Sequence, residues 1–171
     1  MPRYVAFLRG VSPMNARMPE LKRCFEAAGF SQVRTILSSG NVAFDARAKS
    51  LDALARRAEE AMARELERSF GTFVRPVDHL QEVLASDPYG GFHVPANAKR
   101  IVTFLRQAPD RAVALPIERD GASIFAVRAA EAFACYVPGD KGPVFMRLLE
   151  RTFGSDITTR TIDTVRKCVV A

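Results

Sequence analysis

Apolar and polar residues follow two different periods along the first half of the chain. Residues 3–9 alternate and are rich in β-forming side chains, which predicts a strand. From Pro19 to Gly29 the apolar residues recur every three or four positions, which predicts a helix that begins near the proline and ends at the glycine. Residues 33–38 and 42–46 predict two further short strands.

The most regular segment is 50–70, where Ser50 is placed to cap a long helix. Its apolar stripe comprises Leu51, Leu54, Ala58, Met62, Leu66 and Phe70. A strand at 72–77 and a short helix at 78–86 follow. The resulting order, strand–helix–strand–strand–helix–strand, is that of the ferredoxin-like βαββαβ unit.

Part of the first half recurs in the second. RYVAFLRG at 3–10 and RIVTFLRQ at 100–107 agree at five of eight positions, and GNVAF at 40–44 resembles GASIF at 121–125. From the second arginine of the first motif to the glycine of the second motif there are 31 residues in the first copy and 15 in the second. The difference, about 16 residues, predicts a duplication in which the first helix of the second copy is shortened or lost.

We therefore expect an α+β protein with two tandem ferredoxin-like (βαββαβ) subdomains, the second with a shortened first helix. The expected boundaries are 1–87 for the first subdomain, 88–98 for a linker, and 99–171 for the second subdomain with a C-terminal helix. In the second subdomain the pattern predicts strands at 99–106, 115–119, 122–128 and 132–137, a helix at 143–153, and a last helix from about Thr161.

Composition adds an expected location. The 171 residues are 48% hydrophobic and 26% charged, which is typical of a globular protein. No apolar run approaches the roughly 20 residues of a membrane span, and the N-terminus lacks the apolar core of a signal peptide. The three cysteines Cys24, Cys135 and Cys168 are few and far apart, which fits a reducing cytoplasm better than a disulfide framework.

The net charge of +6 is unevenly distributed. Residues 1–47 carry seven basic and three acidic side chains (+4), residues 48–87 carry six and eight (−2), and residues 88–171 carry twelve and eight (+4). Two basic regions therefore flank an acidic one, which favours an anionic partner such as a phosphate-containing metabolite or a nucleic acid. A basic surface without a specific ligand is the alternative.

The segment Ser38-Ser39-Gly40-Asn41 has two interpretations. As structure, Gly40-Asn41 is a two-residue hairpin link, because both residues tolerate positive φ. As chemistry, it resembles an element of penicillin-recognising serine enzymes, but their Ser-x-x-Lys and Lys-Thr-Gly motifs do not occur here. The hairpin is the favoured interpretation.

Other catalytic signals are also missing. The sequence has no Gly-x-Ser-x-Gly, Walker or Gly-x-Gly-x-x-Gly motif. Its two histidines, His79 and His93, are placed at a helix start and in the linker, and no Cys/His pair has zinc spacing. We therefore predict no metal or cofactor, and we assign no catalytic residue.

Topology predicts where an anion would bind. In a βαββαβ unit the first two strands are parallel and the third lies beside the first, so the loop after the first strand and the turn after the second share one end of the sheet. One arginine, short polar side chains and backbone N–H groups could bind an anion there. The residues brought together are Arg9, Gly10, Ser12, Asn15, Ser39, Gly40 and Asn41. Alternatively, Arg9 pairs with an acidic side chain or packs its stem.

The same residues carry a family resemblance. Leu8-Arg9-Gly10, Ser39-Gly40-Asn41-Val42 and Thr158-Thr159-Arg160 are its most specific parts, and the segments 3–10, 18–29 and 33–44 extend it. Together they resemble a bacterial family known as domain of unknown function 1697. The resemblance spans nearly the whole chain and implies two tandem ferredoxin-like subdomains, with no established activity.

The chain departs from this family in two places. Val11-Ser12-Pro13-Met14-Asn15 stands where the family usually has Ile-Asn-Val-Gly-Gly, and the loss of paired glycines stiffens the loop. Residues 161–165 read TIDTV where the family usually continues Asn-Trp-Asn-Thr-Val. A ligand held by that asparagine and tryptophan would bind poorly to this chain.

The C-terminal motif also has a purely structural interpretation. Thr158, Thr159 or Thr161 can cap the last helix, with Asp163 in its first turn. Arg160 is then the candidate ligand-binding residue of this region.

Three functions remain open. The best supported is a binding module for an anionic ligand, although the strands lack the paired aromatic residues of RNA-recognition domains. The second is an enzyme acting on a small phosphorylated or carboxylated metabolite. The third is a structural protein that forms homo-oligomers through exposed sheet edges.

Overall fold

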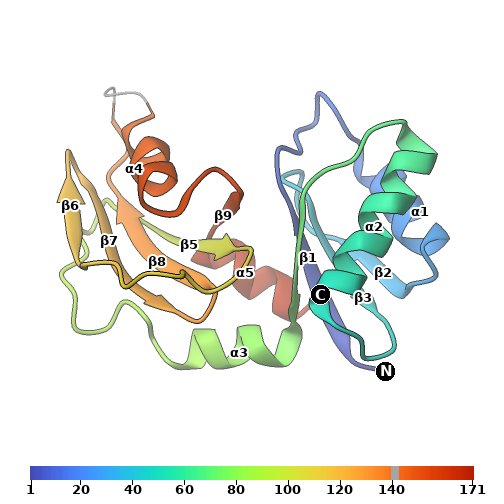
Figure 1. Ribbon diagram of the computed structural model, residues 1–171, viewed down its shortest axis with the longest axis horizontal. Helices are drawn as coiled ribbons and strands as arrows, with labels where there is room; N and C mark the ends of the chain where they lie inside the picture. The colour runs from blue at the N-terminus through green and yellow to red at the C-terminus, as the bar shows by residue number, and fades with distance from the viewer. Residues whose placement is uncertain (140–142) are drawn as a thin grey trace. The chain divides into compact units, whose positions relative to one another are not determined.

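Figure 1 shows the computed structural model of the chain, which describes residues 1–139 and 143–171. These residues form a mixed α+β fold with two antiparallel sheets and five helices. The chain divides into two compact units. The first unit comprises residues 1–85 and 165–171, and the second comprises residues 86–164.

The first unit is built on a four-stranded sheet of order β2-β3-β1-β4, in which all neighbouring strands are antiparallel. Its elements are β1 (Arg3–Leu8), α1 (Met18–Ala27), β2 (Ser31–Thr35), β3 (Asn41–Asp45), α2 (Leu51–Leu66), β4 (Thr72–Pro76) and α3 (Val77–Ala85). The central strand β1 is buried from Tyr4 to Leu8. Residues 165–169 of α5 (Ile162–Val169) also belong to this unit.

Local signals fix the ends of α1 and α2. Gly29 ends α1 with φ of +91°, a conformation that glycine adopts without steric cost. The Ser50 side chain caps α2 by accepting a hydrogen bond from the Ala53 amide at 3.1 Å, as the sequence predicts. The helix ends at Leu66, earlier than predicted, because Glu67 adopts a left-handed conformation with φ of +56°.

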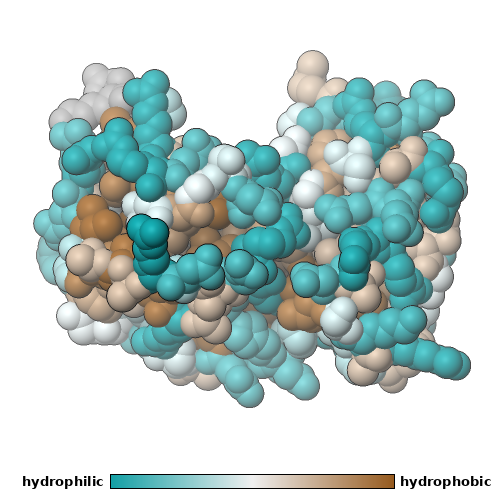
Figure 2. Space-filling view, in the orientation of Figure 1, coloured by the Kyte–Doolittle hydropathy of each residue, from teal (hydrophilic) through white to brown (hydrophobic). Residues whose placement is uncertain are grey.

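Both helices cover one face of the first sheet (Figure 1). The hydrophilic surface over α1 and α2 is visible in Figure 2, as their polar faces require. Beneath them an aromatic cluster surrounds Phe44, whose ring centroid lies 4.3 Å from that of Phe30, 5.6 Å from Phe25 and 5.7 Å from Tyr4. Phe44 is fully buried, so this cluster is the centre of the core of the first unit.

The second unit is built on a five-stranded antiparallel sheet of order β6-β7-β8-β5-β9. Its elements are β5 (Lys99–Leu105), β6 (Ile117–Arg119), β7 (Ala122–Arg128), β8 (Glu131–Tyr136), α4 (Val144–Phe153) and β9 (Ile157–Thr161). Helix α4 packs Phe145, Leu148 and Leu149 against one face of this sheet. No helix lies between β5 and β6, where residues 106–116 are irregular.

The sequence did not predict the strand at residues 157–161, and only one of its three candidate caps for the last helix has that role. These residues form strand β9, which pairs with β5, so Thr158 and Thr159 do not cap a helix. Threonine is a β-forming residue as well as a capping residue, and the pairing with a strand some fifty residues away outweighs the local signal. Only Thr161 caps α5, accepting a hydrogen bond from the Thr164 amide at 3.2 Å.

Every helix among the residues that the structure describes is too short or too polar to cross a lipid bilayer.

Replacing Phe44 by alanine tests the assigned core. The Phe44→Ala variant should lose about 3–5 kcal/mol of unfolding free energy, because a large cavity opens among three aromatic rings. Phe44→Leu, which keeps most of the apolar volume, should lose less. Amide hydrogen exchange of β1 and β3 reports on the first unit by itself. Similar exchange rates in wild type and Phe44→Ala would contradict the assigned core.

Candidate functional site

The turn between β2 and β3 is longer than the sequence suggests. The turn comprises residues 36–40, and Asn41 is the first residue of β3. The predicted two-residue Gly40-Asn41 link is therefore wrong. Gly40 has φ of +87°, as a turn glycine often does, but the second positive φ is at Leu37 (+59°) rather than at Asn41.

Asn41 has a structural role. Its side chain is fully buried, and its Nδ2 donates hydrogen bonds to the Ile36 carbonyl at 2.8 Å and to Ser39 Oγ at 2.9 Å. The Ile36 amide donates in return to the Asn41 carbonyl at 2.9 Å. These bonds connect the two ends of the turn and stabilise it. They also satisfy polar groups that would otherwise be buried without partners.

The loop after β1 meets this turn. The Leu8 amide donates a hydrogen bond to the Gly40 carbonyl at 2.8 Å. A Cβ atom at Gly40 would lie 2.8 Å from Val11 Cβ and 3.1 Å from Leu8 Cβ, so the two segments touch. We call residues 9–17 and 36–40 together the Arg9 rim.

Hydrogen bonds within the rim hold the first loop in shape. Asn15 Nδ2 donates to the Gly10 carbonyl at 2.8 Å, and Asn15 Oδ1 accepts from the Ser12 amide at 2.9 Å. The Met14 amide also donates to Ser12 Oγ at 3.3 Å. Gly10 has φ of +81° and open space on its Cβ side, so other molecules can approach its backbone closely.

Three exposed arginines lie at the rim, Arg9 and Arg17 within it and Arg68 bonded to it. Arg9 is exposed, and its own amide is fixed by donation to the Gly71 carbonyl at 2.8 Å. No residue that the structure describes pairs with the Arg9 side chain. Arg68, which the sequence did not single out, is also exposed and donates from Nη1 to the Asn15 carbonyl at 3.2 Å.

Arg160 lies in β9 of the second unit rather than beside a helix cap. It is buried, and its Nη1 donates to Thr158 Oγ1 at 2.8 Å and to the Thr159 carbonyl at 2.7 Å. These bonds hold the guanidinium against its own strand.

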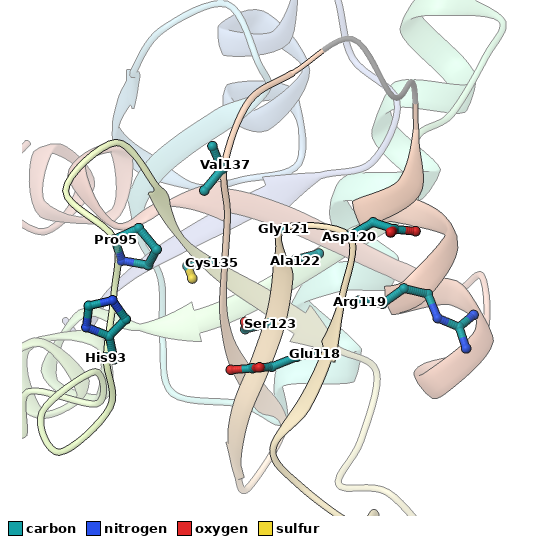
Figure 3. A pocket seen from close by; sticks show the side chains of 10 residues that line it. All are labelled: His93, Pro95, Glu118, Arg119, Asp120, Gly121, Ala122, Ser123, Cys135 and Val137. Carbon is teal, nitrogen blue, oxygen red and sulfur yellow. The ribbon is translucent and has the colours of Figure 1, made fainter.

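The second unit contains a pocket of about 330 Å³ that the sequence did not reveal (Figure 3). Its polar lining includes His93, Glu118, Ser123 and Cys135. The signal that could have revealed it is Asp120-Gly121, because both residues have positive φ in a two-residue hairpin. That turn fixes the register between β6 and β7 and places Glu118 opposite Ser123.

The thiols are poor nucleophiles. All three cysteines are free and buried. Burial raises the pKa of the Cys135 thiol, against the opposing effects of a hydrogen bond with Ser123 and of the Arg100 charge. Burial likewise raises the pKa of Cys24. Within residues 1–139 and 143–171, no three His, Cys, Asp or Glu side chains are grouped to hold a metal ion.

These features define a mixed α+β protein with a basic rim on one sheet and a small pocket on the other. A family model described as "Protein of unknown function (DUF1697)" matches residues 1–133, and the chain belongs to this family. The matched range contains the whole Arg9 rim, whereas Cys135 and Arg160 lie beyond it.

A solved structure shows the same fold. The chain is similar to the conserved bacterial protein SP0830 from Streptococcus pneumoniae, with a TM-score of 0.72 and 17% sequence identity. The likeness covers 99% of this chain and 97% of that one. None of the curated proteins matches the chain.

Two glycine substitutions test the geometry of the rim. Gly10→Ala and Gly40→Ala should each cost about 1–2 kcal/mol, because alanine is strained at positive φ. Gly40→Ala should cost about 1–3 kcal/mol more, since its Cβ would overlap Val11, whereas the space at Gly10 is open. Chemical denaturation followed by circular dichroism measures both. Equal losses would show that the two segments do not touch.

Proposed function

We propose that the Arg9 rim binds an anionic ligand, with a phosphate group as the part that it recognises. The observation that carries this proposal is the exposed guanidinium of Arg9 on a main chain that is fixed on both sides. The Leu8 amide donates to Gly40, just before β3, and the Arg9 amide donates to Gly71, just before β4. Because the main chain is already fixed, binding has to order only the Arg9 side chain.

The surroundings of Arg9 support an anion rather than a cation. Arg17 lies in the same loop, and Arg68 brings a further guanidinium to it through its bond to Asn15. Ser38 and Ser39 are exposed on the neighbouring turn. Gly10 leaves open space beside Arg9, so a phosphate oxygen has room to approach the backbone. In this proposal Asn15 and Asn41 position the rim, because their side-chain amides are already bonded within it.

The proposal extends to the fold of each unit. We infer that the two sheets are ferredoxin-like subdomains that arose by duplication, with boundaries at 1–87 and 99–171. Support comes from strand order, since β2-β3-β1-β4 in the first sheet corresponds to β7-β8-β5-β9 in the second, with β6 added at the edge. The first repeated motif falls in corresponding strands, β1 and β5. The second motif falls in β3 and β7, which differ by one strand in this correspondence because β3 matches β8.

Titration with inorganic pyrophosphate tests the proposed site. Arg9→Ala should weaken binding about 10-fold or more, because a charge-assisted hydrogen bond is lost. Arg47→Ala is the matched control, since Arg47 is exposed just after the opposite end of β3. Isothermal titration calorimetry measures the dissociation constants. Equal binding by Arg9→Ala and wild type would contradict the proposal.

A second experiment distinguishes a small metabolite from a nucleic acid. Filter binding of single-stranded RNA and of DNA is measured at 50 and 200 mM salt. A nucleic-acid ligand should give a steep loss of affinity with salt, in proportion to the number of phosphate contacts. Pyrophosphate binding without retention of either polymer would favour a metabolite.

A further inference from the structure

The pocket of the second unit is built on one face of its sheet. Glu118 on β6 lies opposite Ser123 on β7, and Ser123 lies opposite Cys135 on β8. Neighbouring strands are about 4.8 Å apart, so these three residues form a row about 10 Å long. Ala134, next to Cys135, faces the core under α4, so the row lies on the opposite face of the sheet.

The segment between α3 and β5 forms one wall of the pocket through His93 and Pro95. Two aromatic anchors hold this segment on the sheet. Tyr89 donates its hydroxyl to the Ile101 carbonyl at 2.6 Å, and the Phe92 ring stacks on Phe125 with 4.8 Å between centroids. The wall is therefore fixed before any ligand binds, which favours a preformed site.

The side chain that β6 directs into the pocket is negatively charged. Figure 3 shows the Glu118 carboxylate extending toward the side where His93 lies, whereas Arg119 points to the opposite side. Among the residues that the structure describes, none pairs with the Glu118 carboxylate. The Arg100 guanidinium, at the far end of the row beyond Cys135, lies over the Tyr89 ring at 5.7 Å from its centroid.

We propose that this pocket binds a small organic molecule carrying a protonated amine, with Glu118 as its counter-ion. A volume of about 330 Å³ is at the lower end of the range for small-molecule sites. Pro95 and Val137 supply apolar surface for a short carbon chain. The Ser123 hydroxyl, between Glu118 and Cys135, offers a second acceptor for the ammonium. This site takes the opposite charge from the Arg9 rim and does not depend on it.

Cys135 provides a reporter inside the pocket. Two methanethiosulfonate reagents of similar size, one with an aminoethyl and one with a sulfonatoethyl group, each form a disulfide with a thiolate and release methanesulfinate. The full chain is labelled at pH 8.5, and peptide mass mapping distinguishes Cys135 from Cys24 and Cys168. Rates are normalised to those with N-acetylcysteine. Because the Arg100 charge opposite Cys135 acts against that of Glu118, the quantity compared is the ratio of the ammonium rate to the sulfonate rate at Cys135. This ratio should be about fivefold higher in wild type than in a variant that lacks the Glu118 charge.

Paired variants test the contribution of Glu118 to this ratio. Glu118→Gln should lower this ratio about fivefold. Glu150→Gln should retain it, because that exposed residue on α4 removes the same charge outside the pocket. An unchanged rate ratio in Glu118→Gln would overturn the proposal.

A titration without covalent chemistry covers the case in which Cys135 reacts with neither reagent. Butylammonium should shift the backbone amide resonances of residues 118–123 and 135 in a saturable manner, and Glu118→Gln should abolish the effect. Butyrate should leave these resonances in place. Equal shifts with butyrate, or no saturable shift with butylammonium, would refute the amine site.

Discussion

The structure of the first unit depends on how the end of its central strand is fixed. At the end of β1, the Leu8 amide is bonded to Gly40 and the Arg9 amide to Gly71, so one short stretch joins the starts of both neighbouring strands. The buried side chains of Tyr4, Ala6 and Leu8 then lie under α1 and α2. Because the strand ends there, the chain leaves the sheet with Arg9 exposed. The same bonds that complete the sheet therefore place a charged side chain at its rim.

The sequence predicts those parts of the fold whose signals are local. Helix α2 follows from its apolar period and from Ser50, and the end of α1 follows from Gly29. Strand β9 could not be found in this way, because its threonines also suit a helix cap and its partner β5 is distant in the chain. The missing helix between β5 and β6 was predictable, since spacing within the repeat has no room for it.

The candidate sites show the same division. The meeting of the Arg9 loop with the turn before β3 follows from strand order alone. The burial of Asn41 could not be predicted in this way. It depends on hydrogen bonds to Ile36 and Ser39, in a turn that is longer than the predicted two-residue link at Gly40-Asn41. The row of Glu118, Ser123 and Cys135 in the pocket depends on the register of three strands. The Asp120-Gly121 turn fixes only the pairing of β6 with β7. The net charge of the chain does not predict the charge of each site, since this basic chain has a pocket with an acidic lining residue.

The most direct test of how β1 positions the rim is nuclear magnetic resonance of the full chain in solution. The contact of Gly40 with Val11 predicts a strong nuclear Overhauser effect between the Gly40 α-protons and the Val11 methyl groups. The bond to Gly40 predicts that the Leu8 amide exchanges with solvent among the slowest in the first unit. Rapid exchange of the Leu8 amide, without that Overhauser effect, would show that the loop and the turn do not form a common rim.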